Sequence, residues 1–335
     1  MRTGKISDSV LKRSVLRQIR TRRQEVLSGA GIGEDCAIFA PSDTCACAVS
    51  EAEVTGEADI ARVLVKCANN LAAAGARPIA VLLTLLLPSE TEESLLKRLM
   101  TAAEETCGRL EMQIAGGHTT VSRHVDSPIA CVTAWGVPWE VGALLTTRGA
   151  KPGQDIVLTK WIGLEGTALL TRLNRQELLE RYPARLVEEA AGFEQYLSVI
   201  PEAAVAAQSG IRVMHDASEG GILAALWELS ESSGVGLTID LRKIPIRQET
   251  VEVCEFCEVN PYALASSGCL VLAADHGESL VERLGREGIP ATVIGQITDS
   301  HDRLICNAGE RRYLDKPAQD EIYRYIEQNL KYRKE

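Results

Sequence analysis

Four short stretches of this sequence combine flexible backbone with polar side chains that could bind a ligand or carry out chemistry. The first reads SGAGIGEDCAIF and contains Gly29, Gly31, Gly33, Glu34 and Asp35. Glycines let backbone N–H groups converge on an anion because no Cβ blocks the approach. Asp35 could then ligate the Mg²⁺ that accompanies a bound phosphate. A tight turn with a solvated tip explains the same residues. The stretch is not a Walker A loop, because it lacks Gly-Lys-Ser/Thr, and the strand expected after it excludes a Rossmann fingerprint.

A second stretch, KCANNLAAAGARP, places an amide on an otherwise apolar helical face. Val63, Cys67, Asn70 and Ala74 recur at the spacing that lines one side of a helix. A buried amide needs hydrogen-bond partners. Asn70 therefore either bonds a neighbouring backbone group, as a structural asparagine does, or faces a ligand.

The third stretch, AGGHTT, is expected to follow a short strand at residues 113–115. Its glycine pair, Gly116 and Gly117, fits either a tight turn or the floor of a polar pocket. Among the five histidines of the chain, His118 has the neighbours that most favour a functional role.

The fourth stretch, MHDASEGGI, joins a strand to a helix. Asp216 and Glu219 have the spacing of a capping box, which is a purely structural explanation. It does not explain Gly220 and Gly221, because each glycine in a first helical turn costs roughly 1 kcal/mol relative to alanine. The close approach of another backbone segment or of a ligand would account for them.

The elements that must position these stretches alternate without strict strand–helix–strand order. Periodicity and stop signals predict helices at 10–20, 57–74, 90–107, 219–232, 248–258, 278–287 and 318–330, with others between 159 and 209. Strands are predicted at 45–49, 79–87, 113–115, 128–137, 155–158, 212–215, 235–240, 269–274, 291–297 and 303–306. This order favours an α+β protein of two α/β sandwich domains with mixed sheets. The turn-rich segment RGAKPG separates them, so the domains are expected at 1–148 and 149–335.

Composition narrows the functional classes. The net charge is −10 and 4% of residues are aromatic, which argues against nucleic-acid binding. No apolar run is long enough to span a membrane, and the first residues lack a secretory h-region, so a cytoplasmic protein is expected. The ten cysteines are expected to stay reduced there, and their spacing does not favour a structural zinc site.

Taken in order, six segments resemble the aminoimidazole-ribonucleotide synthetase (PurM-like) superfamily. They are GIGEDCAIF, SEAEV, KCANNLAAAGARP, AGGHTT, MHDASEGGILAALWELSESSGVGLTID and ASSGCLVLA. Within that superfamily the chain most resembles the hydrogenase-maturation branch called HypE. Each motif alone has low specificity, whereas six motifs in the same order are far more specific.

The resemblance implies a two-domain fold in which the N-terminal domains of two subunits pair into a β-barrel. It implies a homodimer that binds ATP with Mg²⁺ and transfers the γ-phosphate to an oxygen, commonly an amide-type carbonyl oxygen. The implied nucleotide contacts are Gly29, Gly31, Gly33, Asp35, Glu51, Asn70, Gly116 and Gly117, and the implied metal ligands are Glu34, Asp35 and Glu51.

Several acidic positions of the superfamily have changed in this sequence. The second acid, an Asp in relatives, matches Glu51, and the third falls on the uncharged Asn70. The fourth falls on His118, where relatives have Asp, Glu or His. By the resemblance, Asn70 and His118 are the catalytic residues that orient phosphate or substrate. The lost negative charge weakens the expected hold on Mg²⁺, which prefers oxygen anions.

The tail also departs from the HypE pattern, which ends in a cysteine that receives a carbamoyl group. This chain ends Tyr332-Arg333-Lys334-Glu335, and its last cysteine is Cys306. Carbamoyl dehydration is therefore not expected.

Two hypotheses for the function of this chain follow. One is an ADP-forming enzyme that activates an oxygen of an unidentified small molecule, or works with a protein thiol donor. The other is a catalytically weak nucleotide-binding sensor or docking protein on the same fold.

Overall fold

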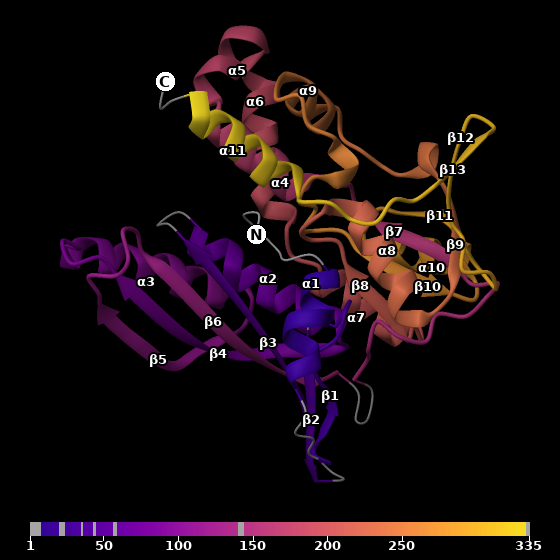
Figure 1. Ribbon diagram of the computed structural model, residues 1–335, viewed down its shortest axis with the longest axis horizontal. Coiled ribbons are helices and arrows are strands. Elements are labelled where there is room, and N and C mark those ends of the chain that lie inside the picture. The colour runs from indigo at the N-terminus through magenta and orange to yellow at the C-terminus, as the bar shows by residue number, and fades with distance from the viewer. Residues whose placement is uncertain are drawn as a thin grey trace. The chain divides into compact units, whose positions relative to one another are not determined.

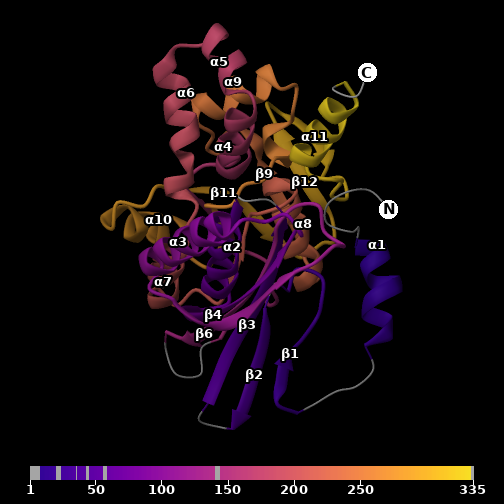
Figure 2. The same cartoon turned by 90° about the vertical axis from the view of Figure 1, so that its left-hand side faces the viewer.

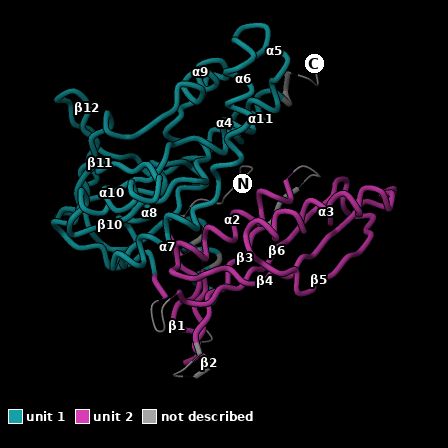
Figure 3. The backbone as a smooth tube through the Cα atoms, turned by 180° about the vertical axis from the view of Figure 1, so that it is seen from behind, with its two compact units in different colours: residues 1–21, 146–335 teal, residues 22–145 magenta. Residues whose placement is uncertain are grey.

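The computed structural model describes residues 8–19, 24–34, 36–42, 45–55, 59–139 and 144–332 (Figure 1). The chain divides into two compact units, which Figure 3 draws in magenta and teal. We call residues 22–145 the first unit (magenta, labelled unit 2 in Figure 3) and residues 1–21 together with residues 146–335 the second unit (teal, labelled unit 1 there). Within the described residues, every helix is too short or too polar to cross a membrane.

The first unit is built on a six-stranded sheet with the order β1-β2-β3-β6-β4-β5. Strands β4 and β5 are parallel, and the other neighbours are antiparallel. The predicted mixed sheet is therefore confirmed. The strands are β1 (Val26–Ser28), β2 (Ala37–Ser42), β3 (Cys45–Thr55), β4 (Ala76–Leu87), β5 (Gln113–Val121) and β6 (Ile129–Pro138).

Two helices, α2 (Ile60–Ala73) and α3 (Glu93–Arg109), cover one face of this sheet (Figures 1 and 2). Helix α2 packs through an apolar stripe that includes Val63 and Cys67, as its helical periodicity predicts. The odd-numbered residues of β4 from 81 to 87 are buried, because alternate residues of a strand point to opposite faces. No described helix of this unit covers the other face of the sheet.

Strand β5 is longer than the sequence pattern predicts. The expected strand ends at residue 115, whereas β5 continues through Gly116, Gly117 and His118 in parallel register with β4. Gly117 has a φ of 146°, and a Cβ there would lie 1.9 Å from the carbonyl oxygen of Leu83. Glycine thus permits a close approach of the two strands. The tight-turn interpretation of this stretch is wrong.

A short helical segment near the N-terminus belongs to the second unit. It consists of α1 (Asp8–Val10), the π-helical turn η1 (Leu11–Val15) and the 3₁₀ turn η2 (Leu16–Gln18). The Nζ of Lys12 lies 2.7 Å from a carboxylate oxygen of Glu231 on α8 (Gly221–Ser233). This ion pair attaches the segment to its unit.

The second unit contains a seven-stranded mixed sheet with the order β13-β12-β9-β11-β7-β10-β8. Strands β12 and β9 are parallel, and the other neighbours are antiparallel. Every residue of β8 and β10 is buried, so both faces of the sheet are covered there. The strands are β7 (Asp155–Thr159), β8 (Val213–Asp216), β9 (Gly236–Asp240), β10 (Leu270–Ala274), β11 (Ala291–Thr298), β12 (Arg303–Asn307) and β13 (Glu310–Tyr313).

Two apolar clusters hold the helices of the second unit. One cluster joins α8 to the sheet. The other joins α4, α5, α6, α9 and α11 to one another (Figure 1). The remaining helices and turns are α4 (Leu164–Leu173), α5 (Arg175–Arg181), α6 (Ala184–Ala191), η4 (Gly192–Tyr196), α7 (Ile200–Gln208), η5 (Leu241–Lys243), α9 (Gln248–Phe256), η6 (Pro261–Ala263), α10 (Gly277–Arg286) and α11 (Glu321–Tyr332).

The start of α8 corrects the predicted capping box. The N-cap is Gly220, with a φ of 82°, so both Asp216 and Glu219 precede the helix. A Cβ on Gly221 would lie 2.7 Å from the backbone oxygens of Tyr262 and Leu264. The close approach of another backbone segment therefore explains this glycine.

We predict that Gly221→Ala destabilises the protein by about 3 kcal/mol, since it combines a left-handed backbone with a backbone clash. The matched control is Gly234→Ala at the other end of α8, where φ is 68° and nothing lies within 4 Å of an added Cβ. It should cost about 1 kcal/mol, the strain of the left-handed backbone alone. Urea unfolding measures the free energy of unfolding of both variants, and equal losses of stability would contradict the clash at Gly221.

Candidate functional site

Asn70 lies on α2 and faces the sheet. Its Nδ2 donates a hydrogen bond of 2.9 Å to the Oγ of Ser50 on β3. Asn70 is 6% exposed and Ser50 is 1% exposed. The amide is therefore a hydrogen-bonded buried group, and the partner shown here is a side chain rather than the backbone group considered from the sequence.

The surroundings of Asn70 on this face of α2 are apolar. Cys67, almost one helical turn earlier, is fully buried, and its Sγ donates to the carbonyl oxygen of Val132 on β6 at 3.6 Å. Burial raises the pKa of the Cys67 thiol to about 12, so the thiol stays protonated. A charged side chain at position 70 would lose its hydration here.

Glu51 follows Ser50 on β3 and points to the opposite face of the sheet, because neighbouring strand residues alternate between faces. Its side chain is exposed, whereas that of Ser50 is buried. The structure therefore does not bring Glu51 and Asn70 to the same side of β3.

His118 is exposed on β5 and shares the face on which Glu51 lies. The Cα register runs across the sheet from Glu51 through Thr133 and Leu82 to Gly116, two residues before His118. Three strand spacings of about 4.8 Å separate Glu51 from β5, roughly 14 Å along the sheet. Both side chains are open to solvent on one face, but they are too far apart to bind a single metal ion.

The glycine-rich stretch forms a tight turn ahead of β2. Gly31 and Glu34 form an isolated antiparallel bridge, and Gly33 within it has a φ of 70°. Glycine adopts this left-handed conformation at little cost. Gly29 follows β1 and is exposed. Asp35 lies outside the described residues, so its position beside the turn stays a prediction.

The described residues form no metal cage made of protein side chains alone, although Mg²⁺ is usually held by one or two carboxylates together with substrate phosphates. No three His, Cys, Asp or Glu side chains among them come together as a metal site. The assignment of Glu34, Asp35 and Glu51 as magnesium ligands therefore stays a prediction from the resemblance.

The cysteine pair on and after α9 is buried. Burial raises the pKa of Cys254 to about 12 and that of Cys257 to about 11, which leaves both thiols protonated and weak as metal ligands.

A buried ion pair in the second unit was missed by the sequence patterns. Lys160, directly after β7, lies 2.6 Å from Glu202 on α7 and donates to the backbone oxygens of Tyr196 and Ser198. Both charged side chains are less than one-tenth exposed. A lysine directly after the apolar run IVLT was the available signal, since lysine is rarely buried unless it is paired.

Two family descriptions match this chain in sequence order. Residues 19–137 match the AIR synthase related protein, N-terminal domain, and residues 151–307 match the AIR synthase related protein, C-terminal domain. The order of the two matches agrees with the order of the six motifs.

Two named proteins are similar to this chain over most of its length. The chain is 29% identical over 272 residues to a provisionally named hydrogenase expression/formation protein of Methanocaldococcus jannaschii, covering 79% of this chain and 78% of that protein. It is 28% identical over 246 residues to the carbamoyl dehydratase HypE of Cupriavidus necator, covering 71% of this chain and 67% of that protein.

A solved structure shows the same fold. The crystal structure of hydrogenase maturation protein HypE in complex with ATP superimposes with a TM-score of 0.66 at 18% identity. The superposition covers 96% of this chain and 97% of that one. The predicted PurM-like fold is thus confirmed, and the chain belongs to the AIR synthase-related superfamily.

Proposed function

We propose that this chain is a cytoplasmic, ATP-dependent enzyme that phosphorylates an amide-type or similar oxygen of a small substrate and releases ADP. The observation that carries the proposal is that both AIR synthase-related domains occur in order in one chain. The shared fold with a HypE protein crystallised with ATP supports it. The second substrate is an unidentified small molecule or a protein thiol donor.

The proposal places the nucleotide on the first unit. Glu51 and His118 are exposed on the same sheet face, which no described helix of this unit covers, so the proposed nucleotide site borders the dimer interface proposed below. Phosphoryl transfer depends mainly on positioning and on neutralising charge. The contacts that the resemblance assigns are Gly29, Gly31, Gly33, Glu34, Asp35, Glu51, Asn70, Gly116, Gly117 and His118, of which Asn70 lies on the packed side of the sheet, opposite Glu51.

Glu51→Gln is expected to weaken ATP binding in the presence of Mg²⁺ by roughly ten- to hundredfold, since one charge-assisted contact contributes about 1.5–3 kcal/mol. Isothermal titration calorimetry on the full chain measures this affinity. Glu105→Gln, which changes an exposed acid on α3, should leave the affinity unchanged. If the wild-type chain binds no ATP at millimolar concentration, the nucleotide proposal fails. If both variants bind like wild type, Glu51 does not belong to the site.

A catalytically weak nucleotide sensor or docking protein is the second candidate. The hydrogen bond between Asn70 and Ser50 favours it, because the amide serves packing where relatives carry an acid. Nucleotide binding without phosphate release over hours would support this candidate, and rapid turnover would eliminate it.

Asn70→Asp separates a structural role of position 70 from a metal-binding role. The Ser50 hydroxyl can turn to donate to a carboxylate, but burying that charge is costly, so we expect a loss of about 2–3 kcal/mol in unfolding free energy. We expect the Mg²⁺-dependent affinity for ATP to stay unchanged. Asn70→Leu, which removes the hydrogen bond without adding charge, is the control for the stability measurement. A clear gain in affinity for Asn70→Asp would show that position 70 faces the metal.

We also propose that two copies of the chain pair through the open face of the first unit's sheet. Leu82 lies on that face and is 39% exposed, which is a large exposure for a leucine in the middle of a strand. Pairing of the two sheets would bury it and would form the β-barrel implied by the resemblance.

Leu82→Asp is therefore expected to shift the protein from dimer to monomer, because the interface would bury an unpaired charge. Size-exclusion chromatography with light scattering measures the mass. Leu173→Asp, at a 49% exposed leucine on α4 of the second unit, should leave the mass unchanged. A wild-type monomer would rule out the dimer, and a dimeric Leu82→Asp would place its interface elsewhere.

A further inference from the structure

The chain passes from the first unit to the second at residues 145–147, and each end of this connection is fixed within its own unit. The N–H of Leu145 donates to the backbone oxygen of Ala74, at the end of α2, at 2.8 Å. The carbonyl oxygen of Thr147 accepts hydrogen bonds from two serine hydroxyls at the end of α8. Leu145 is 7% exposed and Thr147 is 6% exposed. A single residue, Thr146, therefore separates two fixed points.

The two serines are Ser232 and Ser233, the last residues of α8, and both belong to the longest of the six ordered motifs. Their hydroxyls lie 3.2 Å and 3.1 Å from the carbonyl oxygen of Thr147. The hydroxyl of Ser232 also lies 3.1 Å from the backbone oxygen of Leu229, one turn earlier in the same helix. Since a hydroxyl has one proton, these two oxygens compete for Ser232. Ser233 is therefore the stronger anchor of Thr147.

The hydroxyl of Ser233 also closes a turn in the connecting segment. It donates to the carbonyl oxygen of Thr147 and accepts the N–H of Ala150 at 3.2 Å. In many β-turns the first carbonyl oxygen and the fourth N–H bond each other directly. Here the serine hydroxyl bridges these two groups, and Gly149 at the third position has a φ of 102°, a conformation that glycine adopts at little cost. The turn is thus fastened to α8.

Thr146 is the point at which the connection is not held. It makes no hydrogen bond with the part of the chain that the structure describes. Rotation about its φ and ψ therefore breaks none of the hydrogen bonds that fix Leu145 and Thr147. The other connection between the units, at residues 20–23, lies outside the described residues.

We propose that Ser232 and Ser233 fasten the connecting turn, residues 147–150, to the second unit and confine the flexible part of this connection to Thr146. The inference rests on these contacts and not on nucleotide binding. It assigns the two serines a positioning role, since they act on the chain that joins the units.

Trypsin cleavage of the full chain after Arg148 tests the fastening. Arg148 is exposed at the second position of the turn, and a protease cuts a folded chain there only while the turn is detached from α8. Ser233→Ala should speed this cleavage about tenfold, because it removes the hydroxyl that holds both ends of the turn. Ser232→Ala should speed it only about twofold, because its proton is shared with Leu229. Mass spectrometry of the fragments measures the initial rates.

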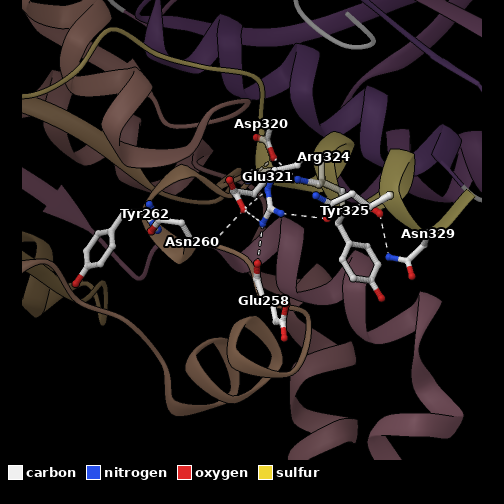
Figure 4. Close-up of polar contacts among 11 residues, drawn as sticks. Glu258, Asn260, Tyr262, Asp320, Glu321, Arg324, Tyr325 and Asn329 are labelled. Carbon is white, nitrogen blue, oxygen red and sulfur yellow. Dashed lines mark hydrogen bonds and ion pairs between the residues drawn. The ribbon is translucent and has the colours of Figure 1, made fainter. Parts of the chain in front are cut away.

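Two controls separate detachment of the turn from a general loss of stability. Figure 4 shows another anchor of the same unit, in which Arg324 on α11 donates to the backbone oxygen of Glu258 at 2.6 Å. Arg324→Met removes that hydrogen bond and should leave cleavage after Arg148 unchanged. In Ser233→Ala, cleavage after Arg286, an exposed residue of α10, should stay at the wild-type rate.

Amide exchange resolved by residue tests the role of Thr146. After correction for intrinsic rates, the N–H groups of Leu145 and Ala150 should exchange more slowly than that of Thr146 by about tenfold or more. In Ser233→Ala the protection of Ala150 should disappear while that of Leu145 remains. Cleavage of Ser233→Ala at the wild-type rate, or a Thr146 amide as well protected as that of Leu145, would overturn the proposal. If Ser233→Ala does not fold, the exchange rates of the wild-type chain decide.

Discussion

The alternation of side chains along β3 is the constraint on which the interpretation of the first unit depends. Ser50 must point into the layer between sheet and helix, and Glu51 must point away from it. Asn70 reaches Ser50 from α2 and is therefore committed to the packed side. Any ligand bound through Glu51 lies on the other side of the sheet, so a site that uses both residues would require β3 or α2 to move. The backbone hydrogen bonds of β3 with β2 and β6 resist such a movement.

Much of the fold could be predicted because its signals are local. Apolar runs and helical periodicity located most strands and helices, and the ordered motifs indicated the superfamily. Three errors remain, two of which were caused by contacts outside the local pattern. Strand β5 extends through Gly116 and Gly117 because β4 approaches closely enough to need them, and β13 was missed because its residues are all exposed and show no apolar alternation. The start of α8 at Gly221 likewise depends on a neighbouring backbone segment that is distant in sequence.

The candidate site was harder to predict than the fold, because it depends on the direction in which side chains point and on the register between strands. Helical spacing correctly placed Asn70 on the buried face of α2, but nothing in the sequence identified Ser50 as its partner. The distance between Glu51 and His118 follows from the strand order β3-β6-β4-β5, which the chain order does not reveal. Asp35 lies outside the described residues, so its part in the site stays a prediction. The resemblance supplied residue roles, and the geometry shows that those residues do not meet at one point of the described structure.

The buried pair of Lys160 and Glu202 limits how this sequence can evolve. Replacing one partner leaves the other charge buried without its counter-ion and lowers the free energy of unfolding by about 3–5 kcal/mol. Replacing both with well-packed apolar residues often leaves stability unchanged. If the two residues are replaced one at a time, the chain therefore passes through a single substitution of low stability. Homologous chains should carry either both charges or neither, and Tyr196 and Ser198 should keep backbone oxygens facing position 160 only where the lysine is present.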